Sequence, residues 1–539
     1  MISVPRPAVS ALADTIVRRL RQAGTRALFG VPGGGGNLDL IEAAATNDLP
    51  FVLTSTETGA AIAALAQSEV TDRPGACLTT LGPGAASVVN GVACAFLDRA
   101  PIAVFTDSNP VGANGTYTHQ HLDQLALFRP ITKWSARLEN GNRAALDEAF
   151  RQLATLPPGP VHLDCPGDVK GTPGFPLGPR RPDTAPPEEA PEIPEAFEAA
   201  IAKARKVLLV VGLGARRAED AAAIRRFCEA RQIPAMVTYK AKGVVPDRHP
   251  CFAGVFTNGA IERALVEKSD LLIGVGLDPV ELVPRPWTFT PPIVGLSDWP
   301  MPTGHVPFGS QWIARTPAAL RVLADRLKKS EWNLDKVATT VSKNLAATDV
   351  PVDGDGLTAQ RVVDVAATML SERRVTVDAG AHMFPATLRW PIAEPAGLLI
   401  SNGLSTMGFA LPAAIGAALV DRKPTVALTG DGGLLMCAGE LVTAARERLP
   451  IMTIVFNDAS LSLIEIKQQA RHLRPAGVAI GAVNWHALAE SLGLASVAAR
   501  TEEELTQAIE LAAAVDGPSL IDVYVDRSNY GAMLKVIRG

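Results

Sequence analysis

The sequence predicts an α/β protein with three doubly wound parallel-sheet domains. Short apolar runs rich in Val, Ile and Leu alternate with helical stretches along almost the whole chain. The runs do not alternate apolar with polar residues, so they are typical of parallel strands that are buried on both faces. A length of 539 residues is too great for one ordinary domain and agrees with several such units.

Composition divides the chain at two places. Proline is dense in segment 171–196, which is therefore predicted to be a linker. A weaker break at 328–356 is interpreted as a helical excursion that ends in a turn. We expect an N-terminal domain over 1–170, a central Rossmann-like domain over 197–345 and a C-terminal domain over 355–539.

The strands are expected at the apolar runs, in chain order. They are RALFGV, PFVLTS, GACLTTL and APIAVFTD in the first domain, KVLLVVG, IPAMVTY, LLIGVG and PPIVGLS in the second, and RVTVDAG, GLLISN, TVALTG, IMTIVFN and SLIDVYV in the third. An amphipathic helix with Val9, Leu12, Ile16 and Leu20 on one side precedes them. Segment 396–420 is uncharged but contains four glycines and a proline, so we expect a buried loop and helix there instead of a membrane span.

Charge and cysteine content exclude several classes of partner. The net charge is −4, from 51 basic and 55 acidic residues, which gives no reason to expect nucleic acid or a membrane surface as partner. The six cysteines are scattered without the spacing of metal ligands, so reduced core thiols and a cytoplasmic location are expected.

Two acidic residues follow directly on neighbouring apolar runs. Asp431 follows TVALTG, and Asp458 follows IMTIVFN after a helix expected over 433–448. Because a strand–helix–strand crossover makes the two strands parallel, both acids should emerge at the same carboxyl edge, where open α/β sheets bind ligands.

A divalent cation would explain why two carboxylates lie beside a site suited to an anion. The glycines of Gly430-Asp431-Gly432-Gly433 allow close approach to the backbone, and the helix start favours a phosphate, which carboxylates alone would repel. Mg²⁺ takes about six oxygens from carboxylates, carbonyls and phosphates, and the Ser460 carbonyl could supply one. A simple turn with a helix-capping Asp is the alternative that the local sequence leaves open.

This pattern resembles a known family. A GDG motif followed about 26 residues later by Asn-Asp after an apolar strand is similar to the thiamine diphosphate-binding motif, and the chain from about 8 to 535 resembles the acetolactate synthase-like, or pyruvate oxidase-type, branch of these enzymes. The resemblance implies that Asp431, Asp458 and the Ser460 carbonyl bind Mg²⁺, which clamps the cofactor diphosphate. The implied cofactor-binding residues are Pro32, Glu57, Pro83, Ser405, Met407, Gly430, Asp431, Gly432, Gly433, Asp458, Ser460 and Leu461.

Glu57 and Met407 have specific roles in this resemblance. Segment 50–67 is similar to the family's E-x-G-A-A block, which implies that Glu57 hydrogen-bonds the cofactor's aminopyrimidine ring and activates its C2 carbon. Without the resemblance, Glu57 is an ordinary first-turn acid of a capped helix. Met407 falls where a bulky residue bends the cofactor, and the Ser405 carbonyl, where relatives often have Gly, accepts from its amino group; the alternative for Met407 is core packing.

The expected surroundings of C2 depart from the family pattern. Gly34 and Gly35, in the turn after FGVP, leave no side chain there, so backbone N–H groups or water would serve an oxyanion. In segment 115–135, His119 and His121 replace the usual Phe and Glu on either side of the family's Gln, here Gln120. These three residues could relay protons or bind a polar substrate, or the segment could be a His-rich surface loop.

Two further positions bear on the reaction. Ile464 falls where pyruvate decarboxylases have a catalytic Glu, and Lys467 where anabolic acetolactate synthases often have a Trp. Simple decarboxylation is therefore disfavoured, and acetolactate is not assured as product.

In the central segment, Gly212 and Gly214 give a weak signal for nucleotide binding. FAD or ADP could bind there, but a central domain without a bound nucleotide is favoured.

The leading hypothesis is a thiamine diphosphate- and Mg²⁺-dependent enzyme that decarboxylates a 2-oxo acid and joins the product to a second carbonyl. The alternatives are a lyase acting on a 2-hydroxy ketone or 2-hydroxyacyl thioester, a non-catalytic cofactor-binding subunit, and a nicotinamide dehydrogenase. Since the family builds its site from the first domain of one subunit and the third domain of another, a homodimer or homotetramer is expected.

Overall fold

The computed structural model describes residues 11–110, 113, 116–139, 143–166, 189–352 and 356–539, so Val9 and most of the expected linker 171–196 lie outside the described residues. The chain forms two compact units. The first comprises Met1–Thr184, Pro412–Arg422 and Cys437–Leu449, and the second comprises Ala185–Leu411, Lys423–Met436 and Pro450–Gly539. Among the described helices, none combines the length and apolarity needed to cross a bilayer.

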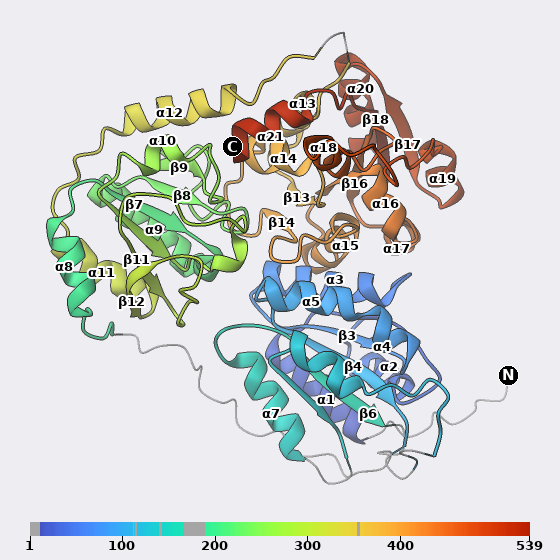
Figure 1. Cartoon of the computed structure of the whole chain (residues 1–539). Helices are drawn as coiled ribbons and strands as arrows, with labels where there is room; N and C mark the ends of the chain where they lie inside the picture. Colours follow the sequence, from blue (N-terminus) through green and yellow to red (C-terminus); the bar gives the residue numbers. More distant parts are fainter. Residues whose placement is uncertain (1–10, 111–112, 114–115, 140–142, 167–188, 353–355) are drawn as a thin grey trace. The chain divides into compact units, whose positions relative to one another are not determined.

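The predicted fold class is confirmed, because the described residues form three six-stranded sheets whose paired strands are all parallel (Figure 1). The first sheet has the order β2-β1-β3-β4-β6-β5, the second β12-β11-β10-β7-β8-β9 and the third β14-β13-β15-β16-β18-β17. The strands are β1 (Leu28–Val31), β2 (Phe51–Leu53), β3 (Gly75–Thr79), β4 (Ile102–Ser108), β5 (Trp134–Arg137), β6 (Val161–Pro166), β7 (Val207–Val211), β8 (Ala235–Val237), β9 (Phe252–Val255), β10 (Leu271–Val275), β11 (Ile293–Ser297), β12 (Phe308–Ile313), β13 (Arg374–Val377), β14 (Leu398–Ile400), β15 (Thr425–Gly430), β16 (Ile451–Asn457), β17 (Ala495–Ala499) and β18 (Ser519–Tyr524).

The first sheet carries helices on both faces. Apolar side chains of α1, α2 and α7 share one core with β1, β3, β4 and β6, while α3 and α5 pack together against the other face. The helices of the N-terminal segment are α1 (Ala11–Ala23), α2 (Asn37–Thr46), α3 (Glu57–Thr71), α4 (Pro83–Ser87), α5 (Val89–Leu97), α6 (Gln124–Phe128) and α7 (Arg143–Ala154). Leu12, Ile16 and Leu20 of α1 are buried in this core, as the amphipathic pattern predicts.

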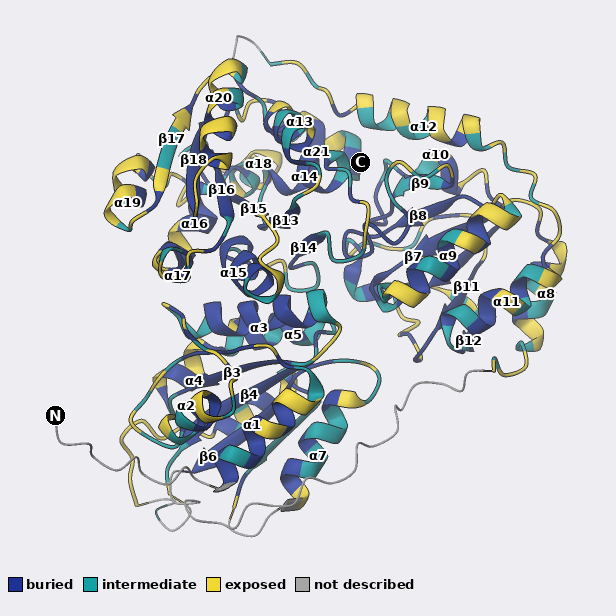
Figure 2. Ribbon diagram, turned by 180° about the vertical axis from the view of Figure 1, so that it is seen from behind, coloured by how far each residue is buried: buried dark blue, intermediate teal, exposed yellow. Residues whose placement is uncertain are grey.

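The two sheets of the second unit are covered in the same way, and their helices show buried inner and exposed outer faces in Figure 2. One core joins α8, α9 and α11 to β7 and β10, and another joins α13, α14, α20 and α21 to β13, β15, β16 and β18. The remaining helices are α8 (Glu195–Lys203), α9 (Ala218–Arg231), α10 (Arg263–Val266), α11 (Thr316–Arg326), α12 (Leu334–Ala346), α13 (Ala359–Leu370), α14 (Met383–Arg389), α15 (Ala410–Asp421), α16 (Asp431–Cys437), α17 (Glu440–Arg446), α18 (Ser462–Ala470), α19 (Trp485–Ser491), α20 (Glu502–Ala513) and α21 (Tyr530–Arg538).

The helix expected over 433–448 is wrong as a single element. Two short helices, α16 and α17, stand in its place and meet at Ala438-Gly439. Glycine is a poor residue inside a helix, and here it also permits a close approach, because a Cβ on Gly439 would lie 3.0 Å from the Cβ of Ser55. The break directs α17 toward the turn that precedes α3.

Strand order explains where a ligand can bind. In the third sheet the order reverses between β13 and β15, and in the first between β1 and β3. Open parallel sheets bind ligands at the carboxyl ends of the strands beside such a reversal. The segments that follow these strands are therefore candidate binding positions, one set in each unit.

Candidate active site

Asp431 and Asp458 emerge from neighbouring parallel strands, as predicted. β15 pairs with β16, and Gly430 lies opposite Phe456 at the carboxyl edge. Asp431 is 4% exposed, and its carboxylate accepts hydrogen bonds from its neighbour Gly432 N at 2.7 Å and from Ala459 N at 2.6 Å. The second acid is bonded locally, since Asp458 accepts from Ser460 N at 3.0 Å and Ser462 Oγ at 2.6 Å.

The two carboxylates form an electrostatically unfavourable pair. Burial raises the pKa of Asp458 to about 6, and the negative charge of Asp431 pushes it in the same direction. Burial also raises the pKa of Asp431. Within the described part of the chain, no three side chains of His, Cys, Asp or Glu gather as a metal site. A cation here would relieve the repulsion, and it would take its further ligands from backbone and phosphate oxygens.

The GDG turn, Met407 and Leu461 come together. A Cβ on Gly432 would lie 2.7 Å from Leu461 Cδ2 and 3.5 Å from Met407 Cε. Ser405, two residues before Met407, has a φ of 54°, a left-handed conformation that glycine adopts most readily. The structure thus brings the predicted wedge residue to the turn that carries the first metal-ligand candidate.

Asp378, which the sequence analysis did not single out, holds this arrangement in place. It follows β13 directly, is fully buried, and accepts hydrogen bonds from Gly408 N at 3.0 Å, Phe409 N at 2.7 Å and Thr429 Oγ1 at 2.8 Å. One carboxylate therefore ties the turn after Met407 to the end of β15. The signal for it was present, since Asp378 ends an apolar strand just as Asp431 does.

His382 is a second residue that was missed. Its ring is 3% exposed, stacks on Phe456 with 4.9 Å between centroids, and burial lowers its pKa to about 4, so the imidazole is neutral. Its buried Nε2 has no hydrogen-bond partner among the described residues, and a Cβ on Gly430 would lie 3.4 Å from its Cε1. The glycine-lined helix start beside this ring offers backbone N–H groups to a phosphate, so this edge suits the diphosphate of the implied cofactor.

Glu57 lies at the corresponding edge of the first sheet, which belongs to the first unit. It begins α3, whose cap is Thr56 with its side chain accepting from Gly59 N at 3.0 Å. A Cβ on Gly84 would lie 3.2 Å from Glu57 Oε1, so the Gly82-Pro83-Gly84 turn adjoins the carboxyl group. This places the implied activating acid beside Pro83.

The loops next to this turn include the other N-terminal candidates. A Cβ on Gly82 would lie 2.7 Å from the Gln120 carbonyl oxygen, and Gln120 has a φ of 56°. His119 and His121 flank it and are exposed; His121 Nδ1 lies 3.4 Å from Asn109 Nδ2. The role of the two histidines stays a prediction.

The glycine turn after β1 packs against an acid that was also missed. Pro32 opens the turn, Gly34 has open space where a side chain would be, and a Cβ on Gly35 would lie 2.7 Å from Asp107 Oδ2. Asp107 is 3% exposed and accepts from Asn37 N at 2.8 Å, and burial raises its pKa to about 6. A side chain at position 35 would therefore clash with the carboxylate of Asp107, which explains the glycine there.

Ile464 and Lys467 lie three residues apart on α18 and are both exposed, Ile464 to 43%. Their place in a substrate pocket stays a prediction.

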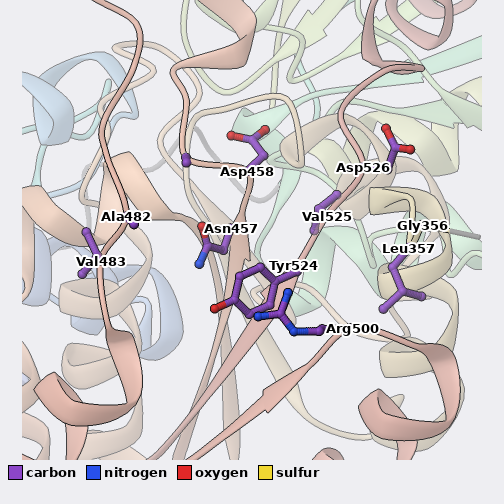
Figure 3. Close-up of a pocket in the computed structure, with 11 residues that line it drawn as sticks. Gly356, Leu357, Asn457, Asp458, Ala482, Val483, Arg500, Tyr524, Val525 and Asp526 are labelled. Atoms are coloured by element: carbon purple, nitrogen blue, oxygen red, sulfur yellow. The ribbon is translucent and has the colours of Figure 1, made fainter.

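A pocket of about 440 Å³ lies on another side of the loop after β16. Asn457, Asp458 and Asp526 line it, together with Arg500 stacked 3.6 Å from the ring centroid of Tyr524 (Figure 3). Of the predicted cofactor residues only Asp458 borders it, so this pocket is not the predicted cofactor site.

The central sheet has its own order reversal, between β7 and β10, where a dinucleotide would bind. The turn after β7 packs against the turn after β10, since a Cβ on Gly214 would lie 3.0 Å from Gly276. Buried Glu281 closes the same edge, accepting from Leu213 N at 2.8 Å and Thr238 Oγ1 at 2.5 Å.

Replacing Glu281 by Gln is expected to flatten the pH dependence of stability. Burial raises the folded-state pKa of Glu281 to about 8 from 4.5, so its protonated form stabilises the fold fully below about pH 4.5, and this contribution is lost as pH rises through 8. Gln stays neutral, so the Tm of the variant relative to the parent should rise between pH 6 and pH 9 by on the order of 2 °C or more. Parallel pH profiles, like those expected for the exposed control Glu267→Gln, would contradict this.

Comparison with known proteins gives a consistent result along the chain. The model described as thiamine pyrophosphate enzyme, N-terminal TPP binding domain, matches residues 10–127; the central domain of the same enzymes matches 195–296, and their C-terminal TPP binding domain matches 378–523. Thiamine pyrophosphate, or TPP, is thiamine diphosphate.

Full-length relatives agree with these matches. The acetolactate synthase of Bacillus subtilis (strain 168) is 29% identical over 96% of this chain and 93% of its own length. The catabolic acetolactate synthase of Raoultella terrigena is 28% identical over 95% of each chain. The acetolactate synthase large subunit of Corynebacterium glutamicum is 30% identical over 95% of this chain and 86% of its own length.

Proposed function

This chain belongs to the thiamine diphosphate enzymes, in the branch related to acetolactate synthases, and we propose that it decarboxylates a 2-oxo acid and joins the resulting fragment to a second carbonyl compound. The observation that carries the proposal is the pair of carboxylates, buried Asp431 and half-buried Asp458, at the carboxyl edge of a parallel sheet beside its order reversal.

The residues at the third sheet would hold the cofactor. Asp431, Asp458 and the Ser460 carbonyl would bind Mg²⁺, and the helix start after Gly430 would receive the diphosphate. When bound, the cofactor supplies a nucleophilic carbon and an electron sink. Met407, whose side chain approaches the GDG turn, would support the bound cofactor.

The residues at the first sheet would act on the reacting end. Glu57 would hold a proton at the cofactor's ring nitrogen, and the turn at Pro83 would contact the same ring. Gln120, His119 and His121 would bind or protonate the substrate, with Gly34 and Gly35 forming a wall without side chains. Ile464 and Lys467 would select the second substrate. Two subunits would supply the two halves of each site.

Product analysis tests the proposed reaction. Purified protein supplied with thiamine diphosphate, Mg²⁺ and pyruvate is expected to release CO₂ and form acetolactate or another 2-hydroxy ketone. A panel of larger 2-oxo acids follows if pyruvate is a poor substrate, since Lys467 departs from the usual Trp. Absence of CO₂ and of any ligation product across the panel would favour the lyase alternative. Absence of cofactor binding would favour neither decarboxylation with ligation nor the lyase reaction.

The assembled protein is expected to be a homodimer or homotetramer. Leu435 and Met436 on α16 are 45% and 59% exposed, which is unusual for large apolar side chains next to a buried acid. Sedimentation equilibrium should give a mass of two or four times 56.6 kDa. A stable monomer that still turns over substrate would contradict the shared-site arrangement.

Three further features belong to the proposal. The domain boundaries 1–170, 197–345 and 355–539 accommodate the three sheets. The tight packing of Gly214 and the buried Glu281 support a central domain without FAD or ADP. All six cysteines are buried and none forms a disulfide, which supports a cytoplasmic location.

A further inference from the structure

A buried glutamate outside the predicted site contacts the turn that leads into Glu57. Glu440 is the first residue of α17 and is 1% exposed. Its Oε1 accepts hydrogen bonds from Thr56 N at 3.0 Å and Ser55 N at 3.1 Å, and Thr56 Oγ1 lies 3.2 Å away. Its Oε2 accepts from Thr443 Oγ1 at 2.8 Å. All these residues belong to the first unit.

These contacts fix the start of α3. The first N–H groups of a helix have no partner within the helix, and a carboxylate near them is favoured by the helix dipole. The side chain of Thr56 is already used as the cap of Gly59, so Glu440 holds the backbone one and two residues ahead of Glu57. A Cβ on Gly59 would collide with Glu440 Oε1, which shows how closely the two helices approach.

Helix α17 contacts both ends of the same turn. Arg446 donates to the Leu53 carbonyl at the end of β2, and Ser55 Oγ donates to the Gly439 carbonyl at 2.6 Å. The turn from Leu53 to Thr56 is therefore fastened by charged groups on a segment nearly 400 residues away in sequence. Burying a charge costs free energy unless the charge is fully hydrogen-bonded. Packing of the core alone therefore does not require the buried carboxylate of Glu440.

We propose that Glu440 is a positioning residue, whose carboxylate sets the place of the Glu57 carboxyl group by holding the turn ahead of it. The inference rests on the proposed role of Glu57. A shift of about 1 Å in a catalytic group lowers rates up to about 10²-fold, whereas cofactor affinity, which depends on the metal and diphosphate site, should change little.

The test compares Glu440→Ala, Glu440→Gln and Gly59→Ala. The readouts are the rate at which the C2 proton of bound thiamine diphosphate exchanges with D₂O, the calorimetric affinity for thiamine diphosphate with Mg²⁺, and Tm. We expect Glu440→Ala and Gly59→Ala to slow exchange at least about ten-fold with affinity within about three-fold of the parent. Glu440→Gln keeps an oxygen for Ser55 and Thr56 and should retain exchange within about three-fold.

Glu262→Ala is the matched control. Glu262 is also 1% exposed and also accepts backbone N–H bonds, from Thr257 at 2.9 Å and Gly259 at 2.6 Å, but in the central segment. It should lower Tm without slowing exchange. Normal exchange in both Glu440→Ala and Gly59→Ala, or equal slowing in Glu262→Ala, would overturn the inference. If Glu57→Gln exchanges the C2 proton as fast as the parent protein does, the proposed function fails instead.

Discussion

Replacing Glu57 by Gln is expected to lower turnover by about 10²-fold or more while leaving cofactor affinity nearly unchanged. Gln has the same shape and keeps the cap of α3, since the Thr56–Gly59 hydrogen bond does not involve the side chain of residue 57. The amide cannot hold a transferable proton at the cofactor ring. The loss should therefore appear in kcat, measured by CO₂ release from a 2-oxo acid.

The control for this variant is Glu42→Gln. Glu42 lies on α2, a helix that packs against the same sheet, and is outside the predicted site. It removes the same charge from the same unit, and its kcat should equal that of the parent. Unchanged turnover in Glu57→Gln would remove the proposed activation chemistry and would support a binding role for the chain. A parallel fall in kcat and Tm would instead indicate that Glu57 serves the start of α3.

Replacing Asp431 by Ala is expected to weaken Mg²⁺-dependent cofactor binding by about 10²-fold or more. The acid is 4% exposed and is held by Gly432 and Ala459, so its position is fixed before a metal arrives. Without it, a bound cation would lose one of its two carboxylate ligands. Calorimetry with thiamine diphosphate at saturating Mg²⁺ measures the effect.

Asp458 allows a sharper comparison. Asn keeps an oxygen at the same reach and also accepts from Ser462 Oγ, so Asp458→Asn should bind within about ten-fold of the parent. Asp458→Ala removes the ligand and should resemble Asp431→Ala. Equal affinities for Asp458→Asn and Asp458→Ala would show that the second position is not a metal ligand.

Much of the fold could be predicted from the sequence because the inner strands are buried on both faces and read as apolar runs. The strands that were missed differ in chemistry. β5, β9, β12 and β17 are edge strands, where one side of the ladder is unpaired and polar residues are tolerated. β6 is internal, but it carries His162 and Asp164, which join Thr106 in a buried hydrogen-bond network.

The site was predictable only in part. Asp431, Asp458 and Glu57 stand in recognisable motifs, and each lies at a strand or helix end as expected. Asp378, Asp107 and Glu440 were missed because their roles depend on contacts between distant segments. Each is a buried acid that accepts from backbone N–H groups elsewhere in the chain, and although Asp378 stands at the end of an apolar run, the local sequence does not identify these partners.

The most direct test of the account is calorimetric titration of the purified protein with thiamine diphosphate, with Mg²⁺ present and after its removal by a chelator. Anchoring of the diphosphate through a cation held by Asp431 and Asp458 predicts saturable binding with Mg²⁺ and a loss of affinity of about 10²-fold or more without it. Equal affinity in both conditions, or no binding in either, would contradict it.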